Sequence, residues 1–95
     1  MLESKDITIE GKKYLYVKLA MEKAPLVLIK GSKGYVMCGY LNMETAEKLG
    51  DVAVRVKGVS DLDSILGATV ESASTAAGSL GIKAGMPVRS IISKL

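Results

Sequence analysis

The sequence predicts an α+β fold, namely a two-layer sandwich in which a largely antiparallel sheet carries short helices on one face. Three observations support this prediction: strand-like alternation in the N-terminal half, helix-capping residues and glycines in the C-terminal half, and no internal repeat. The chain has 95 residues, of which 48% are hydrophobic, and this size suits a single domain over residues 1–95 with one core.

The first two strands are expected to form a hairpin. Ile7 and Ile9 alternate with polar residues, Gly11 permits a turn, and the alternation returns from Tyr14 to Met21. The second strand has one aliphatic face and one aromatic, basic face. The aliphatic face carries Leu15, Val17, Leu19 and Met21, and the other carries Tyr14, Tyr16, Lys18 and Ala20. We expect the aliphatic face to point into the core and the aromatic face to point away from it.

The outward strip of Tyr14, Tyr16 and Lys18 has two interpretations. Aromatic and basic side chains on a sheet can stack nucleic acid bases, or they can form half of a subunit interface, in which tyrosine is enriched. The sequence contains no RNP-like motif, and its formal charge of +3 comes from lysines that are scattered rather than clustered. Both observations argue against nucleic acid as a partner and favour the interface.

Two central strands are apolar on both faces. Pro25 ends the second strand because proline cannot donate a ladder hydrogen bond, and residues 26–29 form the next strand. A turn over residues 31–34 leads into a strand that reaches Leu41. Strands with two apolar faces belong at a covered sheet centre, and a few short helices cannot cover both faces. We therefore expect a homo-oligomer, most simply a two-fold dimer.

A helix and a further strand are expected after this junction. Asn42 is a good N-cap for a helix over residues 43–49, which Gly50 ends. Residues 52–57 then alternate between valine and other residues, as a half-buried strand does.

A second short helix should follow. Ser60 and Asp63 resemble the two ends of a capping box, with aspartate in place of glutamate, and Gly67 closes the helix. Residues 69–72 are expected to form one more strand.

The last quarter of the chain is expected to be helical. Small residues predominate over residues 72–82, which we interpret as one helix with a Schellman stop at Gly81 and Ile82. Pro87 suits the first position of a terminal helix that reaches Leu95. The apolar stripe of this helix consists of Val88, Ile91, Ile92 and Leu95.

The composition excludes several kinds of chemistry. The sequence contains no histidine and a single cysteine, so Ser-His-Asp and Cys-His catalysis and the usual zinc sites are excluded within one chain. We expect no metal and no cofactor. The N-terminal segment is charged, apolar runs are short, and the lone cysteine forms no intrachain disulfide, which together favour a cytoplasmic protein without a membrane segment.

Three phrases of the chain are similar to those of a known family. They are GYVMCGYL at residues 34–41, the segment from Gly58 to Leu66, and LGIKAGM at residues 80–86. In their order and spacing, the chain resembles the YunC-like proteins, known as domain of unknown function 1805, over nearly its full length. The resemblance implies a small single-domain α+β protein from archaea or bacteria without an established activity, and it implies no catalytic residue.

Cys38 is the candidate nucleophile. It lies four residues before the capped helix, whose N-terminus can favour a thiolate, and Gly39 lets a substrate approach closely. A cysteine beside Val36 and Met37 is also a typical small core residue. Because the chain has no histidine base, the structural role is favoured, and whether the protein is an enzyme stays open.

Two segments are candidate anion sites. Residues 31–34 could present successive N–H groups to a phosphate, but they lack the spacing of a P-loop, and a hairpin turn is the favoured interpretation. At Ser72, Ser74 and Thr75, hydroxyl and N–H groups converge on a helix start, which suits an anion and equally suits capping.

We expect the junction after Cys38 and this helix start to lie side by side and to form one pocket. The ligand-binding candidates are Gly39, Tyr40, Asn42, Ser72, Ser74 and Thr75. Two helix N-termini in one pocket would favour a small anionic ligand or the carboxylate of a metabolite. The sequence thus favours a homo-oligomeric binding or assembly module for a small ligand. The alternative is a histidine-independent enzyme that uses Cys38 as a thiol nucleophile.

Overall fold

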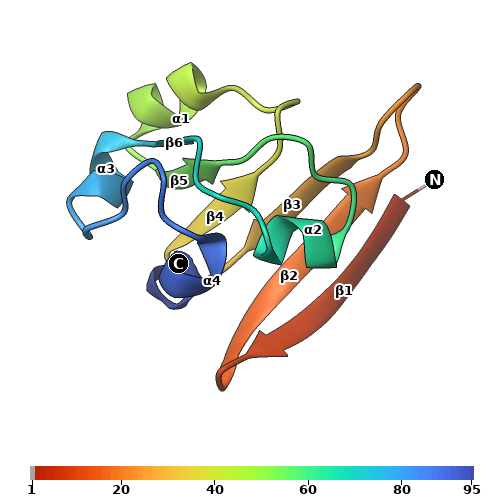
Figure 1. Ribbon diagram of the computed structural model, residues 1–95, viewed down its shortest axis with the longest axis horizontal. Coiled ribbons are helices and arrows are strands. Elements are labelled where there is room, and N and C mark those ends of the chain that lie inside the picture. The colour runs from red at the N-terminus through yellow and green to blue at the C-terminus, as the bar shows by residue number, and fades with distance from the viewer. Residues whose placement is uncertain (1) are drawn as a thin grey trace.

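The computed structural model describes residues 2–95 and contains a six-stranded sheet with short helices (Figure 1). The order of strands across the sheet is the order of the sequence, from β1 to β6. Neighbouring strands are antiparallel except β4 and β5, which are parallel. The predicted α+β fold with a largely antiparallel sheet is therefore confirmed.

The elements are short, and most agree with the sequence prediction. The strands are β1 (Leu2–Ile9), β2 (Lys12–Leu19), β3 (Leu26–Lys30), β4 (Gly34–Met37), β5 (Val52–Arg55) and β6 (Ser72–Ala73). The helices are α1 (Met43–Leu49), α2 (Leu62–Leu66), α3 (Thr75–Gly78) and α4 (Val88–Ile91), and a 3-10 turn, η1 (Ile92–Lys94), follows α4. No helix in residues 2–95 is long and apolar enough to cross a membrane.

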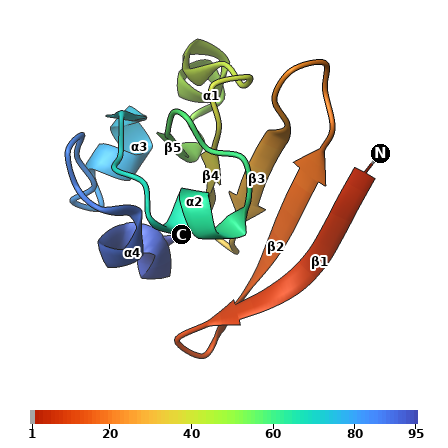
Figure 2. The same cartoon turned by 45° about the vertical axis from the view of Figure 1, so that its right-hand side comes forward.

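The β1–β2 hairpin forms one side of the molecule, and β1 is the edge of the sheet (Figure 2). Its two-residue turn consists of Glu10 and Gly11, which both have positive φ, at 51° and 80°. Two positive φ angles fit a type I′ turn, the turn whose twist matches that of the flanking strands. The predicted hairpin is confirmed, with Ile9 opposite Lys12 and Leu2 opposite Leu19.

The main core lies on the face of the sheet that α2, α4 and η1 cover. Its sheet side comes from buried residues of β2 to β5, including Tyr16, Ile29, Val36 and Val54. Its helix side includes Ile65 of α2 and the predicted C-terminal stripe of Val88, Ile91, Ile92 and Leu95, all of which are buried.

α1 lies on the opposite face, so the prediction that the helices share one face is wrong for this helix. Ala46 of α1 packs against Met37 and Ala53, which point away from the main core because they alternate with Val36 and Val54. α1 is the crossover that joins the parallel strands β4 and β5. A seven-residue helix is about 10 Å long, so it covers β4 and β5 and leaves β1 to β3 uncovered on this side.

The orientation predicted for β2 is also wrong. Tyr14 and Tyr16 are buried in the main core, at 4% and 2% exposure, whereas Leu15 is 39% exposed on the other face. The hydroxyl of Tyr14 donates to the main-chain oxygen of Ile92 at 2.9 Å. This hydrogen bond gives the buried phenol hydroxyl an acceptor, so the C-terminal segment can pack against the tyrosine face of β2.

Several boundaries differ from those that the sequence predicts; β4, for example, ends at Met37 and not at Leu41, and α4 ends at Ile91 before η1. The N-cap of α2 is Asp61, and its capping box is completed by Ser64, one residue later than predicted. α3 begins only at Thr75 because Ala73 instead pairs with Val54 as part of β6, and it ends at Gly78. Residues 69–71 form no ladder; Thr69 makes an isolated bridge to Pro87, which is an N-cap and not a first helical residue.

Candidate functional site

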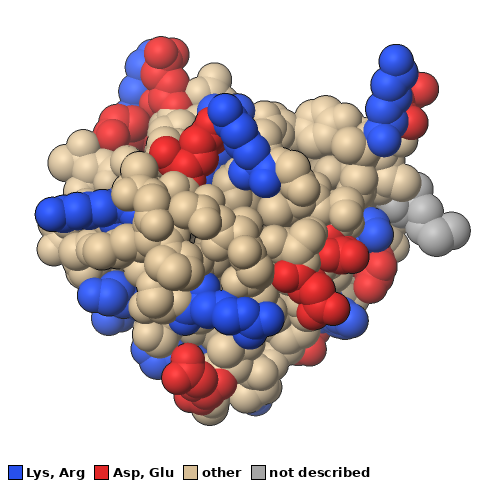
Figure 3. Space-filling view, in the orientation of Figure 1, with Lys and Arg blue, Asp and Glu red and all other residues tan. Residues whose placement is uncertain are grey.

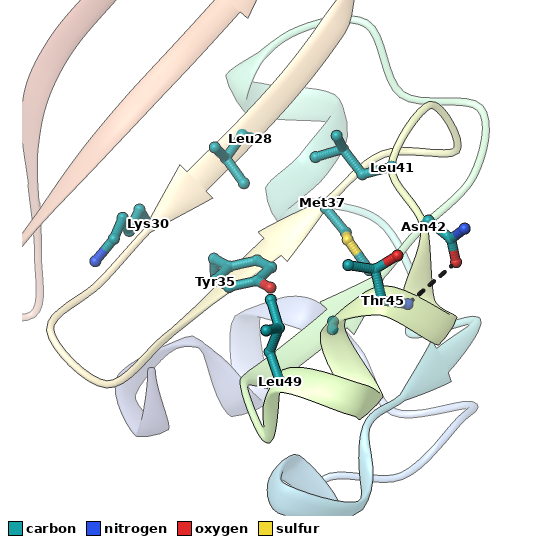
Figure 4. A pocket seen from close by; sticks show the side chains of 9 residues that line it. Leu28, Lys30, Tyr35, Met37, Leu41, Asn42, Thr45 and Leu49 are labelled. Carbon is teal, nitrogen blue, oxygen red and sulfur yellow. Dashed lines mark hydrogen bonds between the residues drawn. The ribbon is translucent and has the colours of Figure 1, made fainter.

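A hollow of about 410 Å³ lies between α1 and the strands β3 and β4, and we call it the α1 hollow (Figure 4). Its lining is mostly apolar, with four residues that carry polar groups. It is lined by Leu28, Lys30, Tyr35, Met37, Leu41, Asn42, Thr45, Ala46 and Leu49. Lys30 lies on one side of the hollow, and Asn42 and Thr45 lie on the other (Figure 4).

The local sequence explains why this space is open. The Asn42 side chain accepts hydrogen bonds from the N–H groups of Glu44 at 2.7 Å and Thr45 at 3.4 Å, which starts α1, and Gly50 ends it with a φ of 76°. The helix faces the sheet with Ala46, whose methyl group allows close approach but fills little volume beside Met37. The predicted cap, helix range and glycine stop are confirmed.

Tyr35 forms the polar end of the hollow. Its hydroxyl donates to Oδ2 of Asp51 at 2.7 Å. Burial, and next the hydrogen bond and charge of Asp51, raise the pKa of Tyr35 to about 12. The phenol therefore stays protonated at neutral pH and is committed to Asp51 as a donor.

A more polar hollow of about 340 Å³ adjoins the α1 hollow and shares Lys30 and Tyr35 with it. Its lining also includes Ser32, Lys33 and Asp51. Lys30 and Lys33 are exposed, and the ammonium group of Lys30 donates to the main-chain oxygen of Gly31 at 3.2 Å. Two lysines thus border one end of a mostly apolar space.

Cys38 lies in the main core, on the other side of the sheet from α1. It is 4% exposed, and its sulfur accepts a hydrogen bond from the N–H of Val27 at 3.4 Å. It contributes to a separate hollow of about 270 Å³ that Pro25, Gly39 and Tyr40 also line. The hydroxyl of Tyr40 donates to the main-chain oxygen of Ala24 at 3.2 Å. Cys38 thus has the environment of a core residue that borders one small hollow.

The helix start at Ser74 is occupied by groups of the protein itself. The Ser74 hydroxyl, which is buried, accepts from the N–H groups of Ala53 at 3.0 Å and Ala77 at 3.2 Å and donates to the oxygen of Asp51 at 2.6 Å. The N–H of Thr75 donates to both carboxylate oxygens of Glu47, each at 3.1 Å. The anion at this helix start is therefore the side chain of Glu47.

The single pocket expected between Cys38 and Ser74 is not formed. Cys38 follows Met37, whose main-chain oxygen accepts a hydrogen bond from the N–H of Val56, just beyond the end of β5. Ser74 is hydrogen-bonded to Ala53, near the start of β5. The two residues thus lie at opposite ends of β5. Of the other candidates, Gly39 and Ser72 both neighbour Arg55 of β5.

Arg55 is the residue that sequence reasoning missed. Its Nη2 donates to the oxygen of Gly39 at 3.0 Å, Ser72 lies opposite it in the ladder, and Glu71 lies 3.8 Å from its Nε. Glu71 also pairs with Lys57 at 2.6 Å. The available signal was a charged residue at a position of β5 whose neighbours are valines.

N–H groups of the turn at residues 31–34 are also hydrogen-bonded to an oxygen atom of the protein itself. The N–H groups of Lys33 and Gly34 donate to the main-chain oxygen of Leu95 at 2.6 and 3.0 Å. A Cβ atom at Gly31 would overlap the same oxygen, so glycine is required there for close approach. The favoured interpretation of this segment as a turn is confirmed by its position between β3 and β4.

Charge on the molecular surface is mixed. On the face shown in Figure 3, which carries α2 and α4, lysine and arginine are interspersed with aspartate and glutamate. Within residues 2–95, no group of three or more Cys, Asp or Glu side chains is arranged to hold a metal ion. The features that remain as a candidate site are the α1 hollow and its two bordering lysines.

A six-stranded sheet with α1 on one face and the C-terminal helices on the other defines a class of small α+β domain. The family model described as "Domain of unknown function (DUF1805)" matches residues 37–95. The uncharacterized protein YunC of Bacillus subtilis (strain 168) is 35% identical over 99 residues, which cover 100% of this chain and 98% of that protein. The chain belongs to the DUF1805 family, as its resemblance to the YunC-like proteins implies.

A solved structure has a similar fold. The crystal structure of a protein of unknown function from Thermoplasma acidophilum is 53% identical in sequence and has a TM-score of 0.97. The match covers 100% of this chain and 93% of that chain. Neither relative's description names an activity.

Proposed function

We propose that the protein is a homo-oligomeric binding module that holds a small, largely apolar molecule with an anionic end in the α1 hollow and performs no reaction on it. The observation that carries the proposal is the hollow itself. Its volume of about 410 Å³ lies in the range of small-molecule sites, and apolar side chains with a few polar groups are the usual lining of such sites. We place this module in the cytoplasm, where a lone thiol stays reduced.

The lining sets the orientation of the ligand. An apolar body would contact Leu28, Met37 and Leu41, which line the hollow. The anionic end would point to Lys30 and Lys33, which border the adjoining polar hollow. Neither lysine forms an ion pair within residues 2–95, so both ammonium groups can contact a carboxylate or a sulfonate.

Binding of a fluorescent apolar anion tests this function. We expect anilinonaphthalene sulfonate to bind the wild-type protein with enhanced fluorescence. Thr45→Phe should weaken this binding about tenfold or more, because an aromatic ring at this exposed position fills the hollow without entering the core. Fluorescence titration gives both dissociation constants.

Glu44→Phe is the matched control, since Glu44 lies on the same helix outside the lining. It should keep the wild-type affinity within about threefold. Equal binding by the wild-type and Thr45→Phe proteins, or no binding by the wild type, would exclude the α1 hollow as the site.

A further inference from the structure

The sheet has a face that no helix or loop of residues 2–95 packs over, and we call it the open face. It is the α1 side of β1, β2 and β3, where Leu15, Val17, Leu19 and Leu28 point outward. These side chains are partly or largely exposed, and Leu15 is 39% exposed. Contiguous apolar side chains on a strand face mark an interaction surface.

Charges of opposite sign flank the apolar centre of this face. In the ladder, Asp6 of β1 lies opposite Leu15 of β2, and Leu15 lies opposite Lys30 of β3. Directly opposed residues point to the same side of a sheet, so Asp6, Leu15 and Lys30 form one row across the open face. Asp6 and Lys30 are both exposed.

We propose that a second copy of this chain covers the open face, with a two-fold axis parallel to β2 above Leu15. Rotation about such an axis keeps positions along the strand and exchanges the two sides of β2. Leu15 then faces Leu15 of the second copy, and Asp6 faces Lys30 of the second copy, whose ammonium group has three N–H donors and can contact both this carboxylate and the ligand. The row of charges is complementary to itself in this arrangement, and each ion pair occurs twice.

The neighbouring rows fit the same axis. Val17 and Leu19 of β2 face their own counterparts, and Ser4 of β1 faces Leu28, which has Val17 as its ladder partner. Lys13 is near the end of β2 and faces its own counterpart, where its long stem can extend past the rim into solvent. Two sheets that pack face to face lie about 10 Å apart, and their strands stay nearly aligned.

This arrangement also completes the α1 hollow, and in that respect it rests on the proposed function. The second copy's β1 would lie above β3, in the layer that α1 occupies above β4 and β5. A helix with its side chains is about as thick as the spacing of two packed sheets, so β1 of the second copy fits beside α1. It would close the side of the hollow that opens toward β2.

Charge reversal tests the pairing. Sedimentation equilibrium should give a dimer of the 10.0 kDa chain, and Asp6→Lys or Lys30→Asp should each weaken it tenfold or more, because each change opposes like charges twice. The double variant Asp6→Lys/Lys30→Asp should restore the dimer to within threefold of the wild type. Lys83→Asp, an exposed charge reversal away from the open face, should have no effect.

A monomeric wild-type protein, or a double variant as weak as the single variants, would overturn the proposal. Leu15→Asp gives a second measurement, since it should yield a folded monomer with unchanged circular dichroism. Probe binding separates this proposal from the proposed function. A monomer that still binds the probe in a Thr45-dependent way refutes only the pairing, and a dimer without such binding refutes only the ligand site.

Discussion

Main-chain N–H groups that could bind an external anion are instead bonded to oxygen atoms of the chain. The N–H of Thr75 donates a hydrogen bond to the carboxylate of Glu47, and the N–H of Gly34 donates to the main-chain oxygen of Leu95. The N–H of Glu44 donates to the side chain of Asn42. Side chains therefore have to supply the charge for an anionic ligand, which is why the proposed site depends on lysines.

The Tyr35 hydroxyl should make stability fall at alkaline pH. Its pKa is raised to about 12 in the folded state and is about 10 in an unfolded chain, so its stabilisation is complete below pH 10 and is lost as pH rises toward 12. Tyr35→Phe should cost about 1 kcal/mol at pH 7 and flatten part of the decline above pH 10. Urea denaturation between pH 7 and 11 measures both effects, and an undiminished decline in the variant would contradict them.

Cys38 should react slowly while the protein is folded. Because the thiol is 4% exposed and bonded to the N–H of Val27, a thiol reagent should label it about a hundredfold or more slower in the native protein than in denaturant. In a Cys38→Ala/Ser79→Cys control, the exposed cysteine should label at the same rate in both states. Native labelling of Cys38 at the denatured rate would favour the thiol enzyme over the binding module.

At the level of elements, Ser74 connects α3 to the start of β5. Ser74→Ala should destabilise the protein by about 2 to 3 kcal/mol, because it removes the cap of α3 and leaves the N–H of Ala53 without its acceptor. Ser79→Ala removes an exposed hydroxyl at the other end of the same helix and should change stability by less than about 0.5 kcal/mol. Chemical denaturation of both variants gives the comparison, and equal losses would show that burial of Ser74 is irrelevant.

Local signals predicted most of the elements. The Asn42 cap, the glycine stop of α1 and the Gly11 turn depend on neighbouring residues only, so the sequence is enough to predict them. The alternation along β2 also predicts a strand, but it does not show which face of that strand is buried in the main core. Leucines suggested one face, and the structure buries Tyr14 and Tyr16 instead, because the C-terminal segment packs on them from far along the chain.

The candidate site was less predictable than the fold. Among the residues that line the α1 hollow, the sequence analysis proposed only Asn42 as a binding residue. The others come from β3, β4, α1 and the loop before α1, and sheet pairing brings them together. Their individual types, such as Leu28 and Met37, are those of ordinary core residues. What makes them a hollow is the short length of α1 and the small side chain of Ala46.

At the scale of the whole molecule, the strand order has a consequence for how the chain folds. Each strand of the sheet pairs with the next strand along the sequence, so each ladder closes only the segment between two consecutive strands and loses little chain entropy. The docking of the C-terminal segment is different. Tyr14 and Ile92, which it brings together, are 78 residues apart, so the contact that completes the main core spans far more of the sequence than any pair of neighbouring strands.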